Sequence, residues 1–152
     1  MRGCLGVVVV AALLSGCASG PTGGEALTGS IRPSASRLVI YRSSVVGFAV
    51  QPNYVIDGRA IAGSQAAGFV VCDLAPGRHE VAVDNMPLSN NLFGQGSEKV
   101  SVDLRPGSTA YLSAAPQMGI VMGQITLIQV TESQGRSDVA GLHQIKGACG
   151  RA

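Results

Sequence analysis

Two similar turn motifs constrain the fold of this chain more than any other feature of its sequence. Residues 71–77 read Val-Cys-Asp-Leu-Ala-Pro-Gly, and residues 101–107, which begin 30 positions later, read Ser-Val-Asp-Leu-Arg-Pro-Gly. Proline presets the φ angle of a tight turn, and glycine accepts the positive φ that often follows it. We therefore expect two hairpins, each with a strand on either side of the turn. A repeated hairpin indicates antiparallel strands stacked in a sandwich.

Other segments also have the composition of β-strands, with many β-branched and aromatic residues. Asp57-Gly58 is the strongest two-residue hairpin signal in the chain. The apolar segment 119–131 favours a central strand, although an edge strand open to β-augmentation is the alternative. We predict an all-β antiparallel sandwich of seven to nine strands, with at most one short C-terminal helix, in 132–140. The predicted strands are 37–42, 53–56, 59–62, 68–74, 79–84, 97–104, 109–114, 119–131 and 142–146.

The N-terminus has the layout of a bacterial export signal. A positive start at Arg2 precedes an uncharged apolar run over 4–14, which is shorter than the about 20 residues that cross a bilayer. Residues 14–17 read Leu-Ser-Gly-Cys and resemble the lipobox of bacterial lipoproteins. The resemblance implies cleavage between Gly16 and Cys17, diacylglycerol on the Cys17 sulfur, and a fatty acid on the new amino group. An uncleaved membrane anchor and ordinary signal cleavage are the alternatives.

The residues after Cys17 predict the location of the protein. In the sorting rule of enteric bacteria, Asp directly after the lipidated cysteine retains a lipoprotein in the inner membrane, whereas Ala18 stands here. We therefore expect the outer membrane, facing the periplasm. Residues 17–36 are rich in Gly, Ser, Pro and Thr without an apolar period, which predicts a flexible tether. The expected organisation is a signal peptide at 1–16, a lipidated cysteine and tether at 17–36, a sandwich at 37–148, and a tail at 149–152.

Cysteine usage agrees with an oxidising compartment. Cys4 leaves with the signal peptide and Cys17 carries lipid, so Cys72 and Cys149 remain. Two leftover cysteines in such a compartment suggest a disulfide, which would tie the tail to a core strand. The alternative is that Cys72 is a small buried hydrophobic residue and Cys149 a free thiol.

Composition and motifs argue against several classes of function. A formal net charge of only +2 gives no electrostatic reason to expect nucleic acid. Neither a Gly-x-Ser-x-Gly elbow nor a phosphate-binding loop occurs, and no cysteine or histidine pair has zinc-ligand spacing. His79 adjoins Glu80, but neighbours on a strand point to opposite faces. We therefore expect no enzyme, no cofactor and no metal.

Three aspartates, Asp57, Asp73 and Asp103, stand at strand ends beside turns. We expect their side-chain oxygens to cap these turns locally. The apolar residues Val45, Val46 and Phe48 lie in a predicted loop at 43–52. Such a loop either folds back over the end of the sandwich or forms a partner-binding edge, because exposed apolar patches usually mark interfaces.

Several of these motifs together resemble a family of small bacterial lipoproteins that carries a domain of unknown function. They are the run Arg-Leu-Val-Ile-Tyr-Arg at 37–42, Val-Ile-Asp-Gly at 55–58, Phe-Val-Val at 69–71, Asp73, and Pro-Gly-Arg-His at 76–79. The turns are also similar to those of surface-layer modules named for a Pro-Glu-Gly-Ala signature, although Pro-Gly-Arg-His replaces it here. The resemblance covers 37–146. It implies a β-sandwich on a lipid anchor and brings no catalytic residues.

The sequence thus favours a non-catalytic, membrane-anchored module that binds another envelope protein or supports its assembly. A binder of cell-wall glycan or of a small ligand is the alternative, because a polar loop at 85–96 adjoins the Pro-Gly turns. A hydrolase with a site assembled from distant residues is the third hypothesis.

Overall fold

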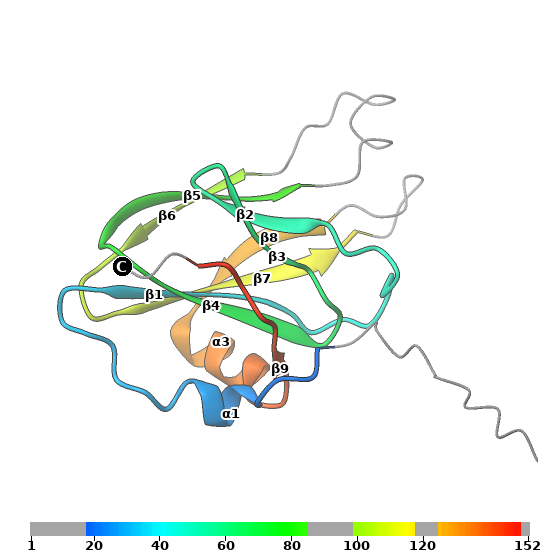
Figure 1. Ribbon diagram of the computed structural model, residues 1–152, viewed down its shortest axis with the longest axis horizontal. Coiled ribbons are helices and arrows are strands. Elements are labelled where there is room, and N and C mark those ends of the chain that lie inside the picture. Colours follow the sequence, from blue (N-terminus) through cyan, green and yellow to red (C-terminus); the bar gives the residue numbers. More distant parts are fainter. Residues whose placement is uncertain (1–17, 85–98, 118–124, 150–152) are drawn as a thin grey trace, which may run out of the picture.

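Nine strands in two stacked sheets form the framework of the computed structural model, which describes residues 18–84, 99–117 and 125–149 (Figure 1). The five-stranded sheet has the order β8 (Ile125–Val130), β7 (Thr109–Pro116), β1 (Ser36–Arg42), β4 (Gly68–Leu74) and β9 (His143–Gln144). The four-stranded sheet has the order β3 (Arg59–Gly63), β2 (Asn53–Ile56), β5 (Gly77–Asp84) and β6 (Lys99–Leu104). The predicted all-β sandwich is confirmed.

The five-stranded sheet is buried on both faces, which explains the unbroken apolar run of β1. Leu38 and Ile40 point into the main core between the sheets, whereas Val39 and Tyr41 point to the opposite face. Alternate residues of a strand face opposite ways, so a strand covered on both sides must be apolar at every position. The main core also receives Tyr54, Ile56, Ile61, Val70, Cys72, Val81, Val83, Val102, Leu104, Leu112, Ala114, Ile125 and Leu127.

Two helices cover the outer face of this sheet, α3 (Glu132–Val139) and the one-turn α1 (Gly23–Ala26) (Figure 1). Gly135 lets α3 approach closely, because a Cβ at that position would collide with the Tyr111 ring. The Tyr41 hydroxyl donates a hydrogen bond of 2.5 Å to the Asp138 carboxylate. Burial, together with this neighbouring carboxylate, raises the pKa of Tyr41 to about 12. The predicted C-terminal helix is therefore present and is fixed to the sheet.

The two Pro-Gly turns connect the two sheets, so the prediction that they close hairpins is wrong. β4 pairs with β1 and β9, whereas β5, which follows the first turn, pairs with β2 and β6. The second turn likewise connects β6 in one sheet to β7 in the other. Proline and glycine specify that the chain reverses, but not whether the strands then pair edge to edge or stack face to face. Only Asp57-Gly58, with φ angles of 49° and 80°, closes a predicted hairpin, between β2 and β3.

Strand pairing is not uniformly antiparallel. Five of the ladders among the described residues are antiparallel, but β1 pairs with β7 and β4 pairs with β9 in parallel. β8 lies at the edge of its sheet, and so the described part of the predicted 119–131 strand is an edge strand. Residues 118–124 and the polar loop at 85–96 lie outside the described residues.

The prediction of a flexible tether is wrong for residues 18–26, which pack against the rest of the domain. Ala18 is buried, the Gly23 amide donates to the Leu142 carbonyl at 3.0 Å, and the Gln144 amide donates to Pro21 at 2.8 Å. A Cβ at Gly20 would collide with the Gln144 carbonyl. The glycines that suggested flexibility instead allow the backbone to pass close to β9.

Candidate functional site

The two ends of the sandwich differ in chemistry. We call one the arch end, formed by the connections 74–77 and 104–109, and the other the loop end, formed by Ala18 and residues 43–52 and 63–68. β1 runs from one end to the other, with Arg37 beside the arches and Arg42 at the start of the loop. At about 3.3 Å per residue, these two residues lie roughly 16 Å apart. Each end therefore has its own set of interactions.

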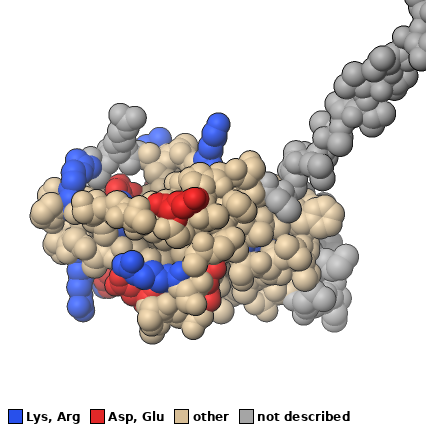
Figure 2. Space-filling model, turned by 90° about the horizontal axis from the view of Figure 1, so that it is seen from below, with Lys and Arg blue, Asp and Glu red and all other residues tan. Residues whose placement is uncertain are grey.

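The loop end carries exposed apolar side chains and no charged side chain in either of its two segments. Val45, Val46 and Phe48 are 60%, 51% and 60% exposed. Residues 43–52 and 63–68 contain no Asp, Glu, Lys or Arg. In Figure 2 the charged side chains gather over the left and middle of the view, and the atoms at the right-hand end that are not grey are mainly tan. The structure therefore places the predicted partner-binding residues on the surface and not over the core. That these residues bind a partner stays a prediction.

One buried side chain, Arg42, holds the loop in place. It is only 1% exposed. Its Nη1 donates to the carbonyls of Val50, at 2.8 Å, and Ser64, at 2.9 Å. Its Nη2 donates to the carbonyls of Val46, at 2.5 Å, and Gly47, at 2.9 Å. A single guanidinium thus joins the two segments of the loop end.

The environment of Arg42 is unusual for a buried cation. No carboxylate pairs with it among the described residues, and burial lowers its pKa. Its Nε, the Tyr54 hydroxyl and the Ser64 hydroxyl are buried without a hydrogen-bond partner in the described part of the chain. An unsatisfied buried polar atom costs about 1–3 kcal/mol. Such departures from full hydrogen bonding are expected where function constrains the sequence.

The first described residue also lies at the loop end. The ideal Cβ position of Gly68 is 2.8 Å from the Ala18 Cβ, so Ala18 lies directly on Gly68. Gly68 in turn pairs with Arg42. Figure 1 shows the blue start of the described chain beside the end of β1 and the start of β4. Gly16 and Cys17 lie outside the described residues, but the Cα of Cys17 is about 3.8 Å from that of Ala18 by covalent geometry.

A disulfide joins Cys72 of β4 to Cys149, with a Cα–Cα distance of 5.3 Å. The neighbouring Ala148 amide donates to the Ile61 carbonyl of β3 at 2.8 Å. Because β3 and β4 belong to different sheets, the C-terminal segment connects both. It closes the side of the sandwich next to the main core, against which Cys149 packs.

Charged residues cluster toward the arch end, where the aspartates do not cap their own turns. Asp73 forms a bidentate ion pair with Arg37, at 2.8 and 3.1 Å. Asp103 does the same with Arg78, at 3.0 and 3.1 Å. Each pair joins neighbouring strands that lie far apart in the sequence. The prediction of local capping is therefore wrong, because strand pairing places an arginine opposite each of these aspartates.

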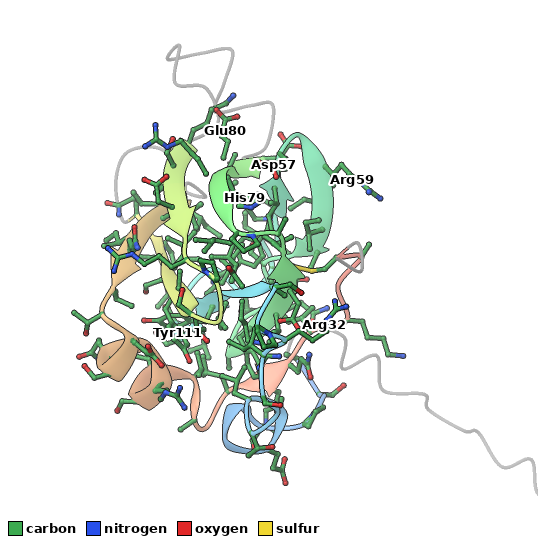
Figure 3. All side chains as sticks on the ribbon, turned by 90° about the vertical axis from the view of Figure 1, so that its left-hand side faces the viewer. Arg32, Asp57, Arg59, His79, Glu80 and Tyr111 are labelled. Carbon is green, nitrogen blue, oxygen red and sulfur yellow. A yellow bond between two sulfur atoms is a disulfide. The ribbon has the colours of Figure 1, made fainter. Side chains whose placement is uncertain are left out.

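Asp57 forms the third of these contacts, with His79 (Figure 3). His79 Nδ1 lies 2.7 Å from the Asp57 carboxylate and Nε2 lies 2.8 Å from the Ala75 carbonyl. Both partners are acceptors, so the doubly protonated ring satisfies both contacts. Burial alone would lower the pKa of His79, but these two bonds outweigh it and raise the pKa. For Asp57, burial opposes ionisation, and the bonds from His79 and the Glu80 amide outweigh it and lower the pKa.

This histidine therefore links the β2–β3 turn to the first arch. Neither ring nitrogen is free to act as a general base while both bonds are in place. Its neighbour Glu80 pairs instead with Lys99, at 2.8 Å. No group of three or more His, Cys, Asp or Glu side chains with metal-binding geometry occurs in the described ranges. Within residues 18–84, 99–117 and 125–149, none of the helices has the length and apolar character needed to cross a bilayer.

Two features of the loop end were missed by reasoning from sequence. The contact between Ala18 and Gly68 has no recognisable motif. The role of Arg42 has a weak signal, because it ends an apolar strand and is followed by fourteen residues without a carboxylate. A guanidinium in that position has to be satisfied locally by neutral acceptors, among them backbone carbonyls.

Comparisons with known proteins give a relative but no activity. No family model matches the chain. An uncharacterised protein of Haemophilus influenzae is 25% identical over 143 residues, which cover 90% of this chain and 80% of the relative. The similarity extends over most of both proteins and agrees with a shared domain of unknown function.

Proposed function

We propose that this protein is a lipoprotein of the bacterial envelope whose domain is a non-catalytic binding or structural module. The chain is cleaved before Cys17, and lipid on that cysteine holds the domain to the outer membrane, facing the periplasm. The observation that carries this proposal is the Leu-Ser-Gly-Cys tetrad at 14–17, which directly precedes a folded domain beginning with the buried Ala18. Cleavage between Gly16 and Cys17 removes no residue of the folded domain that begins at Ala18.

Two further observations support an anchored protein of an oxidising compartment. A disulfide between Cys72 and Cys149 is of the kind that persists outside the cytosol. One acyl chain binds a membrane only marginally, whereas the two or more chains of a processed lipoprotein hold it stably. The resemblance to small lipoproteins with a domain of unknown function points the same way.

A non-catalytic role is supported by the contacts of the His79–Asp57 pair. His79 and Asp57 resemble part of a catalytic dyad, but the second ring nitrogen is bonded to Ala75 at 2.8 Å. The pair thus holds loops together. By contrast, the exposed Val45, Val46 and Phe48 offer a surface for binding.

Membrane fractionation tests the anchor. The native protein is expressed in a Gram-negative host beside Cys17→Ala and, as a matched control, Cys4→Ala, since Cys4 lies in the signal peptide and is removed with it. We expect native protein and Cys4→Ala in outer-membrane fractions, and Cys17→Ala either soluble or retained with its signal. Equal membrane association of all three proteins in their processed forms would contradict the proposal.

Crosslinking tests the binding role. Quantitative crosslinking in intact cells should recover one dominant envelope protein bound to this chain. Substitution of exposed residues in the domain should lower the amount of that crosslinked complex. Recovery of abundant background proteins only would count against a protein partner. Sedimentation with purified peptidoglycan would then decide whether cell-wall glycan is bound instead.

A further inference from the structure

Ala18, the residue that follows Cys17 in the sequence, lies near the apolar loop. Ala18 packs on Gly68, Gly68 pairs with Arg42, and Arg42 bonds to the carbonyl of Val46. Neighbouring strands lie about 4.8 Å apart, so Ala18 and the loop are separated by the contact with Gly68, one strand spacing and the Arg42 side chain. Ala18 and the apolar loop both belong to the loop end (Figure 1).

The packed N-terminal segment removes the freedom that a tether would give. Gly23, Gln144 and His143 fasten residues 20–23 to the chain around β9. Only the bond between Cys17 and Ala18 then separates the lipid from the folded domain. Since the acyl chains must enter the bilayer, the loop end has to lie at the membrane surface.

The chemistry of the loop end suits that position. Val45, Val46 and Phe48 are each at least half exposed, and no charged residue occurs in 43–52 or 63–68. A charged group or an unsatisfied backbone group is costly at the edge of the hydrocarbon region. The segment therefore lacks the side chains that would oppose insertion.

Four backbone carbonyls of the loop accept hydrogen bonds from side chains of the protein. Arg42 occupies the carbonyls of Val46, Gly47 and Val50. The Gln51 side chain donates to the Phe48 carbonyl at 3.0 Å. These four carbonyls do not depend on water, so they can leave the aqueous phase and keep their hydrogen bonds.

We propose that Val45, Val46 and Phe48 enter the interfacial region of the same leaflet that holds the Cys17 lipid, giving the domain a fixed orientation with its arch end away from the membrane. This inference rests on the proposed lipidation of Cys17. It assigns the loop to lipid and leaves the rest of the domain surface for any envelope partner. A buried Arg42 then has a function, which is to keep the loop carbonyls bonded in a medium that supplies no donors.

The test uses the absence of tryptophan from the chain. Phe48→Trp places one fluorophore in the loop, and Arg59→Trp places one at an exposed position beside the β2–β3 turn, toward the arch end (Figure 3). Each full-length, processed protein is reconstituted in vesicles of phosphatidylethanolamine and phosphatidylglycerol, with or without bromine on the acyl chains. Intact mass establishes lipidation, and vesicle flotation establishes binding.

We expect the emission of the Phe48→Trp protein to shift to shorter wavelength and to be quenched by brominated lipid, whereas the Arg59→Trp protein shows neither effect. Equal quenching of the two lipidated, vesicle-bound proteins would overturn the membrane-contacting loop but leave the lipoprotein proposal standing. Protection of the Phe48→Trp fluorophore from acrylamide without quenching by bromolipid would also overturn it, in favour of a protein occupant. An unlipidated mature protein would overturn both proposals.

A second measurement uses no tryptophan, so its result does not depend on whether tryptophan distorts the loop. The soluble Cys17→Ala domain, expressed without its signal peptide, should bind the same vesicles weakly. Replacing Val45, Val46 and Phe48 by serine should weaken that partition roughly tenfold or more. Unchanged partition, with an unchanged melting temperature, would contradict insertion of the loop.

Discussion

Ala18 lies directly against Gly68, the residue of β4 that pairs with Arg42 at the end of β1. This contact makes the segment before β1 part of the domain and places its first residue at the loop end. Glycine is required at position 68 because a side chain there would meet Ala18 and Ile145, with ideal Cβ distances of 2.8 and 2.9 Å. The contact between Ala18 and Gly68 therefore holds the loop end close to the lipid that we propose on Cys17.

Substitution of Gly68 should release the N-terminal segment. We expect Gly68→Val to lower the free energy of unfolding by about 1–3 kcal/mol, because the added atoms overfill a packed site. The measurement is urea unfolding together with limited proteolysis before residue 30. Gly29→Ala is the matched control, since no atom lies within 4 Å of a Cβ there. Equal protease sensitivity of the two variants would contradict the packing of Ala18 on Gly68.

Removal of the Arg42 guanidinium should destabilise the loop. We expect Arg42→Met to cost about 2–4 kcal/mol, because four carbonyls lose their donor and at least some stay buried. Hydrogen exchange should accelerate at the Val50 amide, which bonds to the Gly47 carbonyl at 2.9 Å. Arg59→Met changes an exposed arginine and serves as the control. A variant of Arg42 with native exchange at Val50 would show that the loop is held in another way.

Loss of the disulfide should affect stability and not architecture. The bridge spans 77 positions of sequence, and a disulfide typically contributes about 2–4 kcal/mol, with the larger values for long loops. We expect the double variant Cys72→Ala, Cys149→Ala to melt at a lower temperature by an amount that matches this loss. Reductant should lower the melting temperature of the native protein alone. An equal response of both proteins to reductant would contradict the bridge.

The His79–Asp57 pair predicts a pH dependence of stability. Because the pKa of His79 in the folded state lies above its ordinary 6.5, the contribution of this pair is complete below pH 6.5 and is lost as the pH rises through the raised value. The pKa of Asp57 lies below its ordinary 3.8, so its contribution is present above pH 3.8 and is lost as the pH falls through the lowered value. Stability from this pair should therefore be greatest between these limits.

Unfolding measured from pH 3 to 9 checks this dependence in the native protein beside His79→Gln. The glutamine variant keeps polar contacts but cannot titrate, so its profile should lack the decline above pH 6.5. Asp57→Asn is the complementary variant, which should remove most of the upward shift in the His79 pKa, measurable by NMR titration. Parallel profiles for the native and His79→Gln proteins would exclude the pair as the origin of the decline.

Much of the fold follows from local sequence pattern. The run of 37–42 predicts β1 because β-branched and aromatic residues fit a sheet buried on both faces, and Asp57-Gly58 predicts its hairpin because both residues accept positive φ. The helix at 132–140 is present as α3. These features depend on residues close in sequence, and so a single sequence reveals them.

The parts that sequence pattern missed depend on long-range pairing. A Pro-Gly turn reverses the chain in a hairpin and in an arch alike, so the sheet to which β5 belongs is decided by its pairing with β2 and β6. Glycine predicts flexibility and close backbone contact equally well, and only the position of β9 shows that Gly20 serves the second purpose. The same holds for Arg42, whose carbonyl partners become visible only when the loop is folded.

The intact mass of the protein extracted from membranes tests the central claim most directly. Lipidation predicts a chain that begins at Cys17, lacks residues 1–16 and carries the added mass of diacylglycerol and a fatty acid. Digestion should place all of the added mass on the N-terminal peptide that contains Cys17. A mature chain that begins elsewhere, or one that begins at Cys17 without acyl mass, would contradict the lipoprotein and, with it, the orientation of the domain on the membrane.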